Sequence, residues 1–320
     1  MILVCAGTRP EMLKLAPVVE AARAMQLPVH VHCSNQQPDL LDPAVLPWET
    51  EGGLTQHLLT EADFVVVQGD TRTAFQSAVH AFEAGVPVFH VEAGVRTFDL
   101  NAPWPEEGYR RMLTQIATYH ACTTFRCRGN LLHNGISAFT NVTGSPIVES
   151  VRARAGTQQI DATDPLLLVT LHRRENRGHF TDILAGALRA SQDHFLSTHW
   201  LSHPNGWATR AKTPLHFSPP DEAVRFAQRL ASATVVLTDS GGVQEECNAL
   251  GVPCVVARSV TDRPESLGEG GAVLGGVTEE GVYDAIGQAL DLDRETIRRD
   301  CFGDGTASHR IAEWWGELLA

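Results

Sequence analysis

Short apolar runs alternate with longer amphipathic stretches along this chain, and that alternation constrains the fold more than any other feature. Strand-like runs in the first half occupy residues 1–6, 29–33, 63–67 and 86–91, with weaker ones at 119–123 and 139–142. Between the first two runs, Pro10–Met25 spaces its apolar residues three and four apart, as an amphipathic helix does. Continuous apolar strands separated by helices form parallel sheets that are covered on both faces. The first half therefore predicts a doubly wound α/β domain.

The alternation restarts after the polar segment AGTQQIDATDP (155–165), which we interpret as a linker. Later strand candidates are 166–171, 199–202, 234–237, 254–257 and 272–274, and helical patterns fall at 181–191, 221–231, 242–250 and 280–290. We expect two Rossmann-like domains, 1–156 and 157–320, that face a central cleft at the carboxyl ends of their strands. The last helical pattern, 307–319, is expected to pack back on the first domain.

Composition excludes several classes of protein. The 320 residues carry a net charge of −13, which disfavours non-specific binding to nucleic acid. No apolar run reaches the ~18–20 residues that span a bilayer. The chain starts without the pattern of a signal peptide. Its 7 cysteines form no C-x-x-C pair, so we expect reduced thiols and a soluble cytoplasmic protein.

Two cofactor fingerprints and the usual zinc spacings are missing from the sequence. The dinucleotide pattern G-x-G-x-x-G and the P-loop pattern are both absent, so we expect no nicotinamide cofactor and no metal. The segment Leu237–Gly242 instead ends a strand and opens a helix with two glycines, a geometry that suits a diphosphate or simply a tight turn. Glu245 and Glu246 follow, either as ribose acceptors or as residues that stabilise the first helical turn.

Charged residues follow several of the predicted strands. Asp70 and Glu92 lie at the ends of two strands in the first half, and Glu106 follows in a later turn. Carboxylates that lie at the same ligand-binding edge of a sheet can have different pKa values, so that one acts as a general acid and another as a general base. In the second half, His172 and Arg173 follow the first strand, where an imidazole beside a guanidinium suits an anion.

Eight ordered motifs carry a resemblance over nearly the whole chain. They are GTRPEMLKLAP (7–17), GDTRT (69–73), HVEAGVRT (90–97), PWPEEGYRR (103–111), LHRREN (171–176), LTDSGGVQEE (237–246), TDRPES (261–266) and FGDGTA (302–307). In this order they resemble the non-hydrolysing, bacterial branch of the UDP-N-acetylglucosamine 2-epimerase family.

The resemblance implies a glycosyltransferase-B type fold and interconversion of UDP-N-acetylglucosamine and UDP-N-acetylmannosamine. UDP leaves C1 as the C2 proton is removed. UDP then returns to C1, and C2 is protonated on the opposite face of the sugar ring. No cofactor or metal is implied, and the expected partner is the UDP-sugar, with neither nucleic acid nor membrane. We further expect a homodimer that serves the biosynthesis of cell-surface polysaccharides.

The resemblance also assigns roles to residues. Asp70, Glu92 and Glu106 match acid/base positions, with the face each serves left open, and His172 matches a residue that helps the diphosphate leave. Arg9, Ser240, Gly241, Gly242 and Arg263 match nucleotide and phosphate contacts, Glu246 the ribose contact and Phe226 the uracil neighbour. Further matched binding positions are Lys14, Arg110, Glu107, Arg173 and His203, the last three at the site of a second, activating UDP-sugar.

Some positions depart from the family pattern. Tyr109 stands where asparagine is usual, and Pro38 stands where an arginine contributes to the activator site. The segment between Gln36 and the third strand is short and is expected to lack a helix. Three alternatives therefore stay open: a hydrolysing epimerase that releases N-acetylmannosamine, a glycosyltransferase, and a UDP-sugar-binding homologue without catalysis.

Overall fold

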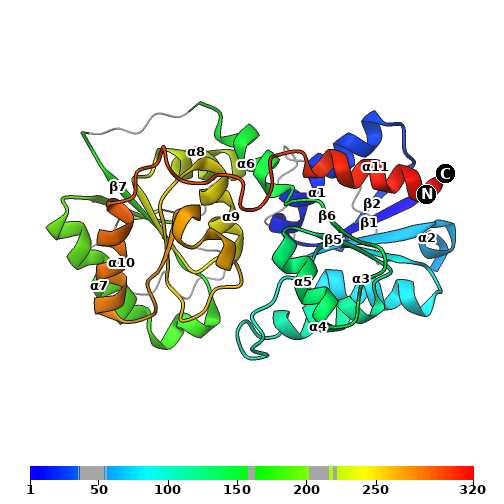
Figure 1. Cartoon of the computed structure of the whole chain (residues 1–320), viewed down its shortest axis with the longest axis horizontal. Coiled ribbons are helices and arrows are strands. Elements are labelled where there is room, and N and C mark those ends of the chain that lie inside the picture. Colours follow the sequence, from blue (N-terminus) through cyan, green and yellow to red (C-terminus); the bar gives the residue numbers. More distant parts are fainter. Residues whose placement is uncertain (35, 37–53, 55, 158–162, 202–215, 219–221) are drawn as a thin grey trace. The chain divides into compact units, whose positions relative to one another are not determined.

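The computed structural model describes residues 1–34, 36, 54, 56–157, 163–201, 216–218 and 222–320. Within this part of the chain, contacts divide the molecule into two units (Figure 1). Unit 1 consists of Met1–Ser150 and Gly303–Ala320, and unit 2 of Val151–Phe302. Each unit contains one sheet of six parallel strands.

The sheet of unit 1 has the strand order β2-β1-β3-β4-β5-β6. Its strands are β1 (Ile2–Ala6), β2 (Val29–Cys33), β3 (Phe64–Gln68), β4 (Val88–Ala93), β5 (Tyr119–Cys122) and β6 (Thr140–Val142). The order reverses between β1 and β3, so that the chain winds outward in both directions from the centre. Such a reversal brings ligands to the carboxyl ends of the strands nearest to it.

Helices cover both faces of this sheet. They are α1 (Arg9–Ala24), α2 (Gln56–Glu61), α3 (Arg72–Glu83), α4 (Glu106–Ile116), α5 (Phe125–His133) and α11 (Ala307–Leu319). The helix after β6, α6 (Ile147–Ala155), crosses the boundary between the two units. Alternate residues of β1 point to opposite faces, since Ile2 and Val4 pack in the cluster of α1 and α11. Leu3 and Cys5 pack with α3 on the other face. This burial on both faces explains why β1 is apolar at every position.

The sheet of unit 2 has the order β12-β11-β10-β7-β8-β9. Its strands are β7 (Leu166–Thr170), β8 (Ser197–Leu201), β9 (His216–Ser218), β10 (Val235–Thr238), β11 (Cys254–Val256) and β12 (Ala272–Leu274). The helices are α7 (Phe180–Asp193), α8 (Ala223–Ser232), α9 (Gly241–Leu250) and α10 (Glu279–Leu290), with the 3-10 turns η2 (Arg174–Gly178), η4 (Pro264–Ser266) and η5 (Gly268–Gly270).

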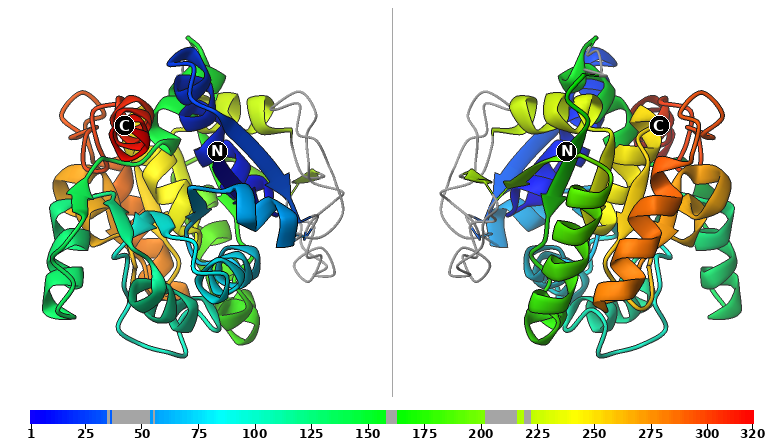
Figure 2. Two further views of the ribbon diagram at one scale, coloured as in Figure 1. Left: turned by 90° about the vertical axis from the view of Figure 1, so that its right-hand side faces the viewer. Right: turned by 90° about the vertical axis from the view of Figure 1, so that its left-hand side faces the viewer.

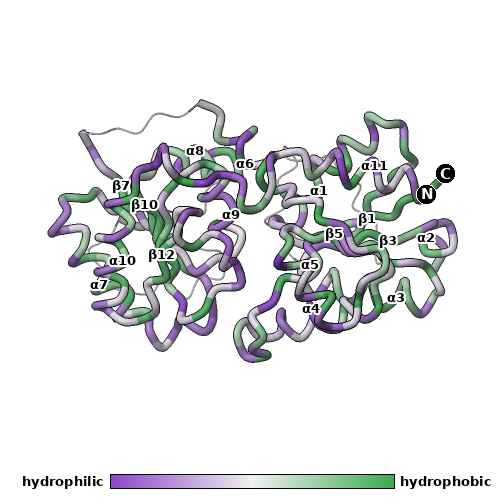
Figure 3. Tube along the Cα trace, in the orientation of Figure 1, coloured by the Kyte–Doolittle hydropathy of each residue, from purple (hydrophilic) through white to green (hydrophobic). Residues whose placement is uncertain are grey.

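The second sheet also has two apolar faces. Leu167 and Val169 face α7 and α10, whereas Leu168 lies in the cluster that holds α8 and α9 residues. Figure 2 shows helices on both faces of the strands, and Figure 3 shows apolar residues along most of the strands of this sheet. Both halves are therefore doubly wound α/β structures of the Rossmann type, as the alternation predicts.

The unit boundary differs from the one expected at residue 156. It falls between Ser150 and Val151, inside α6. The second half of this helix is bonded to unit 2, because Arg152 donates to the carbonyl of Ala249 and Arg154 to that of Ala223. Residues 303–320 belong to unit 1 rather than to a domain that ends at 320, since α11 packs on α1 and buries Trp315 there.

Three elements differ from the predicted ones. Strand β4 extends to Ala93, so Glu92 lies within it. Strand β9 was not expected. The segment before β3 contains the short helix α2, although part of that segment lies outside the described residues. None of the described helices has the length and apolar character required to cross a membrane.

Candidate active site

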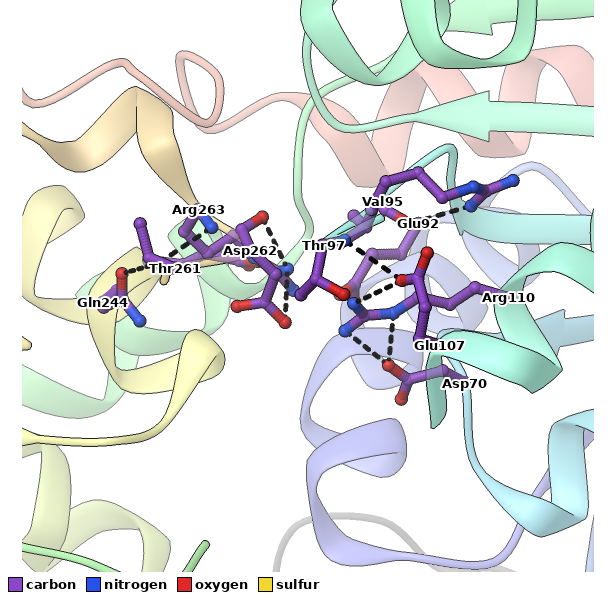
Figure 4. A network of polar contacts seen from close by, with 12 residues as sticks. Asp70, Glu92, Val95, Thr97, Glu107, Arg110, Gln244, Thr261, Asp262 and Arg263 are labelled. Carbon is purple, nitrogen blue, oxygen red and sulfur yellow. Dashed lines mark hydrogen bonds and ion pairs between the residues drawn. The ribbon is translucent and has the colours of Figure 1, made fainter. Parts of the chain in front are cut away.

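Asp70 and Arg110 form an ion pair at the carboxyl end of β3. The Nε atom of Arg110 donates to Oδ2 of Asp70 at 2.7 Å, and Nη2 lies 2.6 Å from the same oxygen (Figure 4). Arg110 is buried on α4, while the Asp70 side chain keeps 24% of its surface exposed. Charge-assisted contacts of this kind hold a carboxylate ionised and fixed. Asp70 is therefore an oriented, partly accessible anion.

Glu92 occupies a bulge at the end of β4. Val91 pairs with Ala121 and Ala93 with Cys122, so Glu92 is the extra residue between them. Its φ of +69° lies in the left-handed region, which a non-glycine residue enters at a cost of roughly 1–3 kcal/mol. Bulges of this kind redirect a side chain. Here Lys14 of α1 and Gln68 of β3 both donate to Oε2 of Glu92.

Glu106 and Glu107 begin α4 but have different surroundings. The Glu107 side chain is fully buried and accepts from the backbone N–H of Thr97 at 3.1 Å and of Phe98 at 3.3 Å. It thereby ties the loop after β4 to α4. Glu106 is half-buried at the first position of the helix, where the helix dipole stabilises a negative charge.

The turn that carries Arg9 is held by a buried carboxylate. Glu11 accepts from the backbone N–H of Gly7 and Thr8, at 3.1 and 2.8 Å, and from the Thr71 hydroxyl at 2.6 Å. Burial raises the pKa of Glu11 to about 7 against these hydrogen bonds. Since Thr71 follows Asp70, Glu11 couples the two turns that present Arg9 and Asp70.

A neutral histidine supports the backbone of the Asp70 turn. The Nε2 atom of His90 lies 2.7 Å from the carbonyl oxygen of Gly69. Burial lowers the pKa of His90 to about 3, so its imidazole is uncharged and donates to that carbonyl. Gly69 itself has φ of +69°, which a glycine adopts without strain. His90 therefore fixes the backbone immediately before Asp70.

In unit 2, the glycine-rich turn forms the N-terminus of α9. Ser240 is the N-cap and its hydroxyl accepts from the N–H of Val243 at 3.4 Å. A Cβ atom at Gly241 would lie 3.0 Å from the carboxylate of Asp262, whereas one at Gly242 would meet only the Ser240 hydroxyl, at 3.9 Å. The turn leaves backbone N–H groups directed away from α9, as anion-binding helix starts do.

Arg263 belongs to a buried network beside this helix start. Its Nε atom donates to Glu245, and its backbone N–H donates to Thr261 at 3.0 Å. Thr261 in turn donates to Gln244 at 2.7 Å (Figure 4). Asp262 accepts from Arg258 at 3.0 Å. The guanidinium of Arg263 is thus held next to α9 by residues of α9 itself.

Asp239 organises the loop that carries His172 and Arg173. This fully buried carboxylate accepts from the backbone N–H of His172 at 3.0 Å and of Arg173 at 2.9 Å. It also accepts from the side chain of Asn176 at 3.0 Å. Burial lowers the pKa of His172 to about 3, with Arg173 and Arg258 adding to the shift. The imidazole of His172 is therefore neutral, and 25% of its side chain is exposed.

The remaining candidates are dispersed over the two units or fall outside the described residues. Glu246 is paired with Arg154 of α6 at 3.1 Å. Phe226 is half-buried on α8. His203 and Pro38 lie outside the described residues. Tyr109 stacks on Phe75 of α3 with ring centroids 4.9 Å apart, so this departure from the family pattern packs α4 against α3.

Sequence reasoning missed four residues that organise the site. Glu11, Gln68, His90 and Asp239 lie inside quoted motifs or directly beside one, but none of them was singled out as a candidate. A signal existed for Glu11, because Thr8 and Glu11 have the spacing of a helix capping box. The other three act through partners that lie more than 20 residues away in the sequence, which local spacing does not reveal.

The fold and site together define a class. Two Rossmann-like units, one with oriented carboxylates at its strand ends and the other with a Gly-Gly helix start, are typical of nucleotide-sugar enzymes of glycosyltransferase-B type. Residues 54–315 match the sequence model of UDP-N-acetylglucosamine 2-epimerase. The chain belongs to the UDP-N-acetylglucosamine 2-epimerase family.

Individual relatives agree with this assignment. The UDP-N-acetylglucosamine 2-epimerase of Bacillus subtilis is 31% identical over 98% of this chain and 93% of its own length. The Methanocaldococcus jannaschii enzyme, solved in complex with UDP-GlcNAc and UDP, has a TM-score of 0.87 and 28% identity, with 99% of each chain covered. The Neisseria meningitidis enzyme bound to UDP-GlcNAc has a TM-score of 0.86 and 27% identity, again over 99% of each chain. These matches favour an epimerase over the hydrolysing alternative.

Proposed function

We propose that this enzyme interconverts UDP-N-acetylglucosamine and UDP-N-acetylmannosamine by inversion at C2. The observation that carries the proposal is the pair of oriented carboxylates, Asp70 and Glu92, at the ends of the neighbouring strands β3 and β4. Proton removal from C2 requires a fixed base, and its return on the opposite face requires a second group. Family membership and the relatives solved with UDP-GlcNAc support the same substrate.

The proposed reaction balances without any added reagent. A carboxylate takes the C2 proton, the C1–O bond to the diphosphate breaks, and a C1=C2 double bond forms. The bound products are 2-acetamidoglucal and UDP. In the second half, a second acid/base group, protonated at the start of the turnover, delivers its proton to the other face of C2 while the diphosphate oxygen re-forms its bond to C1. Proton exchange with solvent then returns both groups to their starting protonation. Asp70, Glu92 and Glu106 are proposed as the acid/base groups.

Cationic side chains and backbone N–H groups are proposed to hold UDP. Ser240, Gly241 and Gly242 offer the helix start of α9, where N–H groups stabilise a diphosphate without titrating. Arg9 and Arg263 are proposed to contact the phosphates, Glu246 the ribose and Phe226 the uracil. Lys14, Arg110, Glu107 and Arg173 complete the proposed binding set, together with His203, which the described residues do not include.

His172 is proposed to act on the departing diphosphate as a neutral donor. Its lowered pKa leaves the imidazole uncharged, so it stabilises the developing charge through an N–H group rather than as a cation. Asp239 holds the backbone of the same loop, which limits the reorganisation needed when charge develops.

The decisive experiment is NMR of the reaction in deuterium oxide, started from UDP-N-acetylglucosamine. An epimerase incorporates deuterium at C2 and forms UDP-N-acetylmannosamine while free UDP stays at trace levels. Accumulation of UDP and free N-acetylmannosamine would identify a hydrolase instead. Binding of UDP without any exchange at C2 would identify a non-catalytic homologue, and transfer that needs an acceptor would identify a glycosyltransferase.

We also propose a cytoplasmic homodimer as the working form. The cytoplasmic assignment is supported by seven free cysteines, six of them buried, which suit a reducing compartment. Sedimentation at micromolar concentration tests the dimer, because a monomeric mass at all concentrations would contradict it.

A further inference from the structure

Gln68 is the neutral member of the pair of donors on Glu92. It is the last residue of β3, only 4% exposed, and its Nε2 atom donates to Oε2 of Glu92. Lys14, 6% exposed on α1, donates to the same oxygen. Two donors from two different elements therefore meet at one carboxylate oxygen, at the bulged residue of β4.

The two donors fix a side chain that the bulge itself does not hold in place. Glu92 has no ladder partner on β5, and its left-handed backbone persists only where its surroundings over-determine it. A long carboxylate side chain on such a residue has several rotamers available. Donors from β3 and α1 that converge on Oε2 restrict the orientation of the carboxylate, and they favour its ionised form.

The two donors are not equivalent. The ammonium of Lys14 attracts the carboxylate from any direction, because a compact charge has little angular preference. The amide of Gln68 is directional and uncharged, and it is carried by the strand that hydrogen-bonds to β4. Gln68 can therefore orient the carboxylate without placing a second positive charge beside it.

We propose that Gln68 is a positioning residue that orients the Glu92 carboxylate for proton transfer at C2. This proposal rests on the proposed function, because it assumes that Glu92 exchanges a proton with the sugar. Gln68 itself touches no reacting atom. Its contribution is expected in the rate of the proton-transfer step and not in the affinity for UDP.

The test variant is Gln68→Met, which keeps the length of the side chain and removes the donor. We expect kcat to fall about 10- to 100-fold, while KM and the Kd for UDP change less than about twofold. With substrate deuterated at C2, the isotope effect on kcat should rise in the variant, since proton transfer becomes the slow step. A structural defect alone would lower the active fraction and leave the isotope effect unchanged.

Two further variants keep the result interpretable. Gln68→Glu preserves the shape but replaces the donor by a like charge, and its kcat should fall below that of Gln68→Met. The matched control Thr123→Val removes a different buried hydrogen bond of unit 1, the one between Thr123 and Cys127, and should leave both kcat and the isotope effect unchanged. If Gln68→Met melts near the wild-type temperature and keeps its rate and isotope effect, Gln68 has no positioning role. Absence of C2 exchange in the wild type would instead refute the proposed function.

Discussion

At the scale of the residue, the three carboxylates Asp70, Glu92 and Glu106 are expected to carry chemistry and not affinity. Changing each one to its amide removes a proton-transferring group but keeps the size of the side chain. Turnover should therefore fall at least ~10²-fold, while UDP affinity changes little. Initial rates and calorimetric titration with UDP measure the two effects, and Asp99→Asn, in an exposed turn, is the control. Near-full activity in all three amide variants would contradict the acid/base role of these carboxylates.

The buried His90 is expected to make the free energy of unfolding depend on pH. The folded protein keeps its imidazole neutral down to a pKa of about 3, against 6.5 for the free group. As pH falls below 6.5 the unfolded chain binds the proton first, so the free energy of unfolding decreases. At pH 5 this linkage amounts to ~2 kcal/mol, at about 1.36 kcal/mol per pH unit.

His90→Gln should remove that share of the acid sensitivity. Urea unfolding at about pH 7.5 and pH 5 measures it, because the variant loses less stability than the wild type between the two values. The exposed His80 on α3 supplies the control, since His80→Gln should retain the wild-type dependence. Equal pH dependence in wild type and His90→Gln would show that His90 titrates normally in the folded state.

At the scale of the element, the loop from β7 into η2 depends on a residue of another strand. Asp239 follows β10 and accepts from two backbone N–H groups and from Asn176. Asp239→Ala leaves buried donors unsatisfied, and we expect a loss of roughly 2–4 kcal/mol in unfolding free energy. Hydrogen exchange at residues 172–176 should accelerate most. Asp284→Ala on the exposed side of α10 is the control, and unchanged exchange in that loop would contradict the assignment.

At the scale of the whole molecule, the chain leaves unit 1, forms unit 2 and returns. Helix α11 completes the core of unit 1 with Trp315, which is fully buried against Phe64 and Phe89. Trp200 has the corresponding role in unit 2, in the cluster of α7 and α10. Each tryptophan therefore reports on a different unit, although Trp315 is near the end of the sequence.

Hydrogen exchange of two full-length variants tests this division. Trp315→Ala should destabilise unit 1 by about 3–5 kcal/mol and accelerate exchange in β1 and β3, with unit 2 less affected. Trp200→Ala should do the reverse. If Trp315→Ala instead accelerates exchange mainly in β7 and β10, the C-terminal helix belongs to the second unit.

Across these scales, the alternation of apolar runs was sufficient to predict the architecture. Strands such as β1 and β7 are buried on both faces, and that environment selects a nearly continuous run of apolar residues, which a sequence displays directly. Strand β9 was missed because only Phe217 of its three residues is apolar, whereas the equally short β11 and β12 are apolar throughout. The division of the chain by contacts falls after Ser150 and not after residue 156. The linker composition marks a loop, whereas the division depends on which unit Arg152 and Arg154 bond to.

Asp70 and Glu92 at strand ends, and the Gly-Gly helix start after β10, could be predicted from the sequence without a structure. The groups that contact these residues are defined by the folded chain and could not be predicted in this way. Lys14 meets Glu92 across 78 residues and Arg110 meets Asp70 across 40. Such pairs form because the strand order places β1, β3 and β4 side by side, while α1 and α4 are the helices that follow β1 and β4 in the chain. Hydrophobic periodicity is a local property of the chain, whereas the partner of a buried charge depends on the whole sheet.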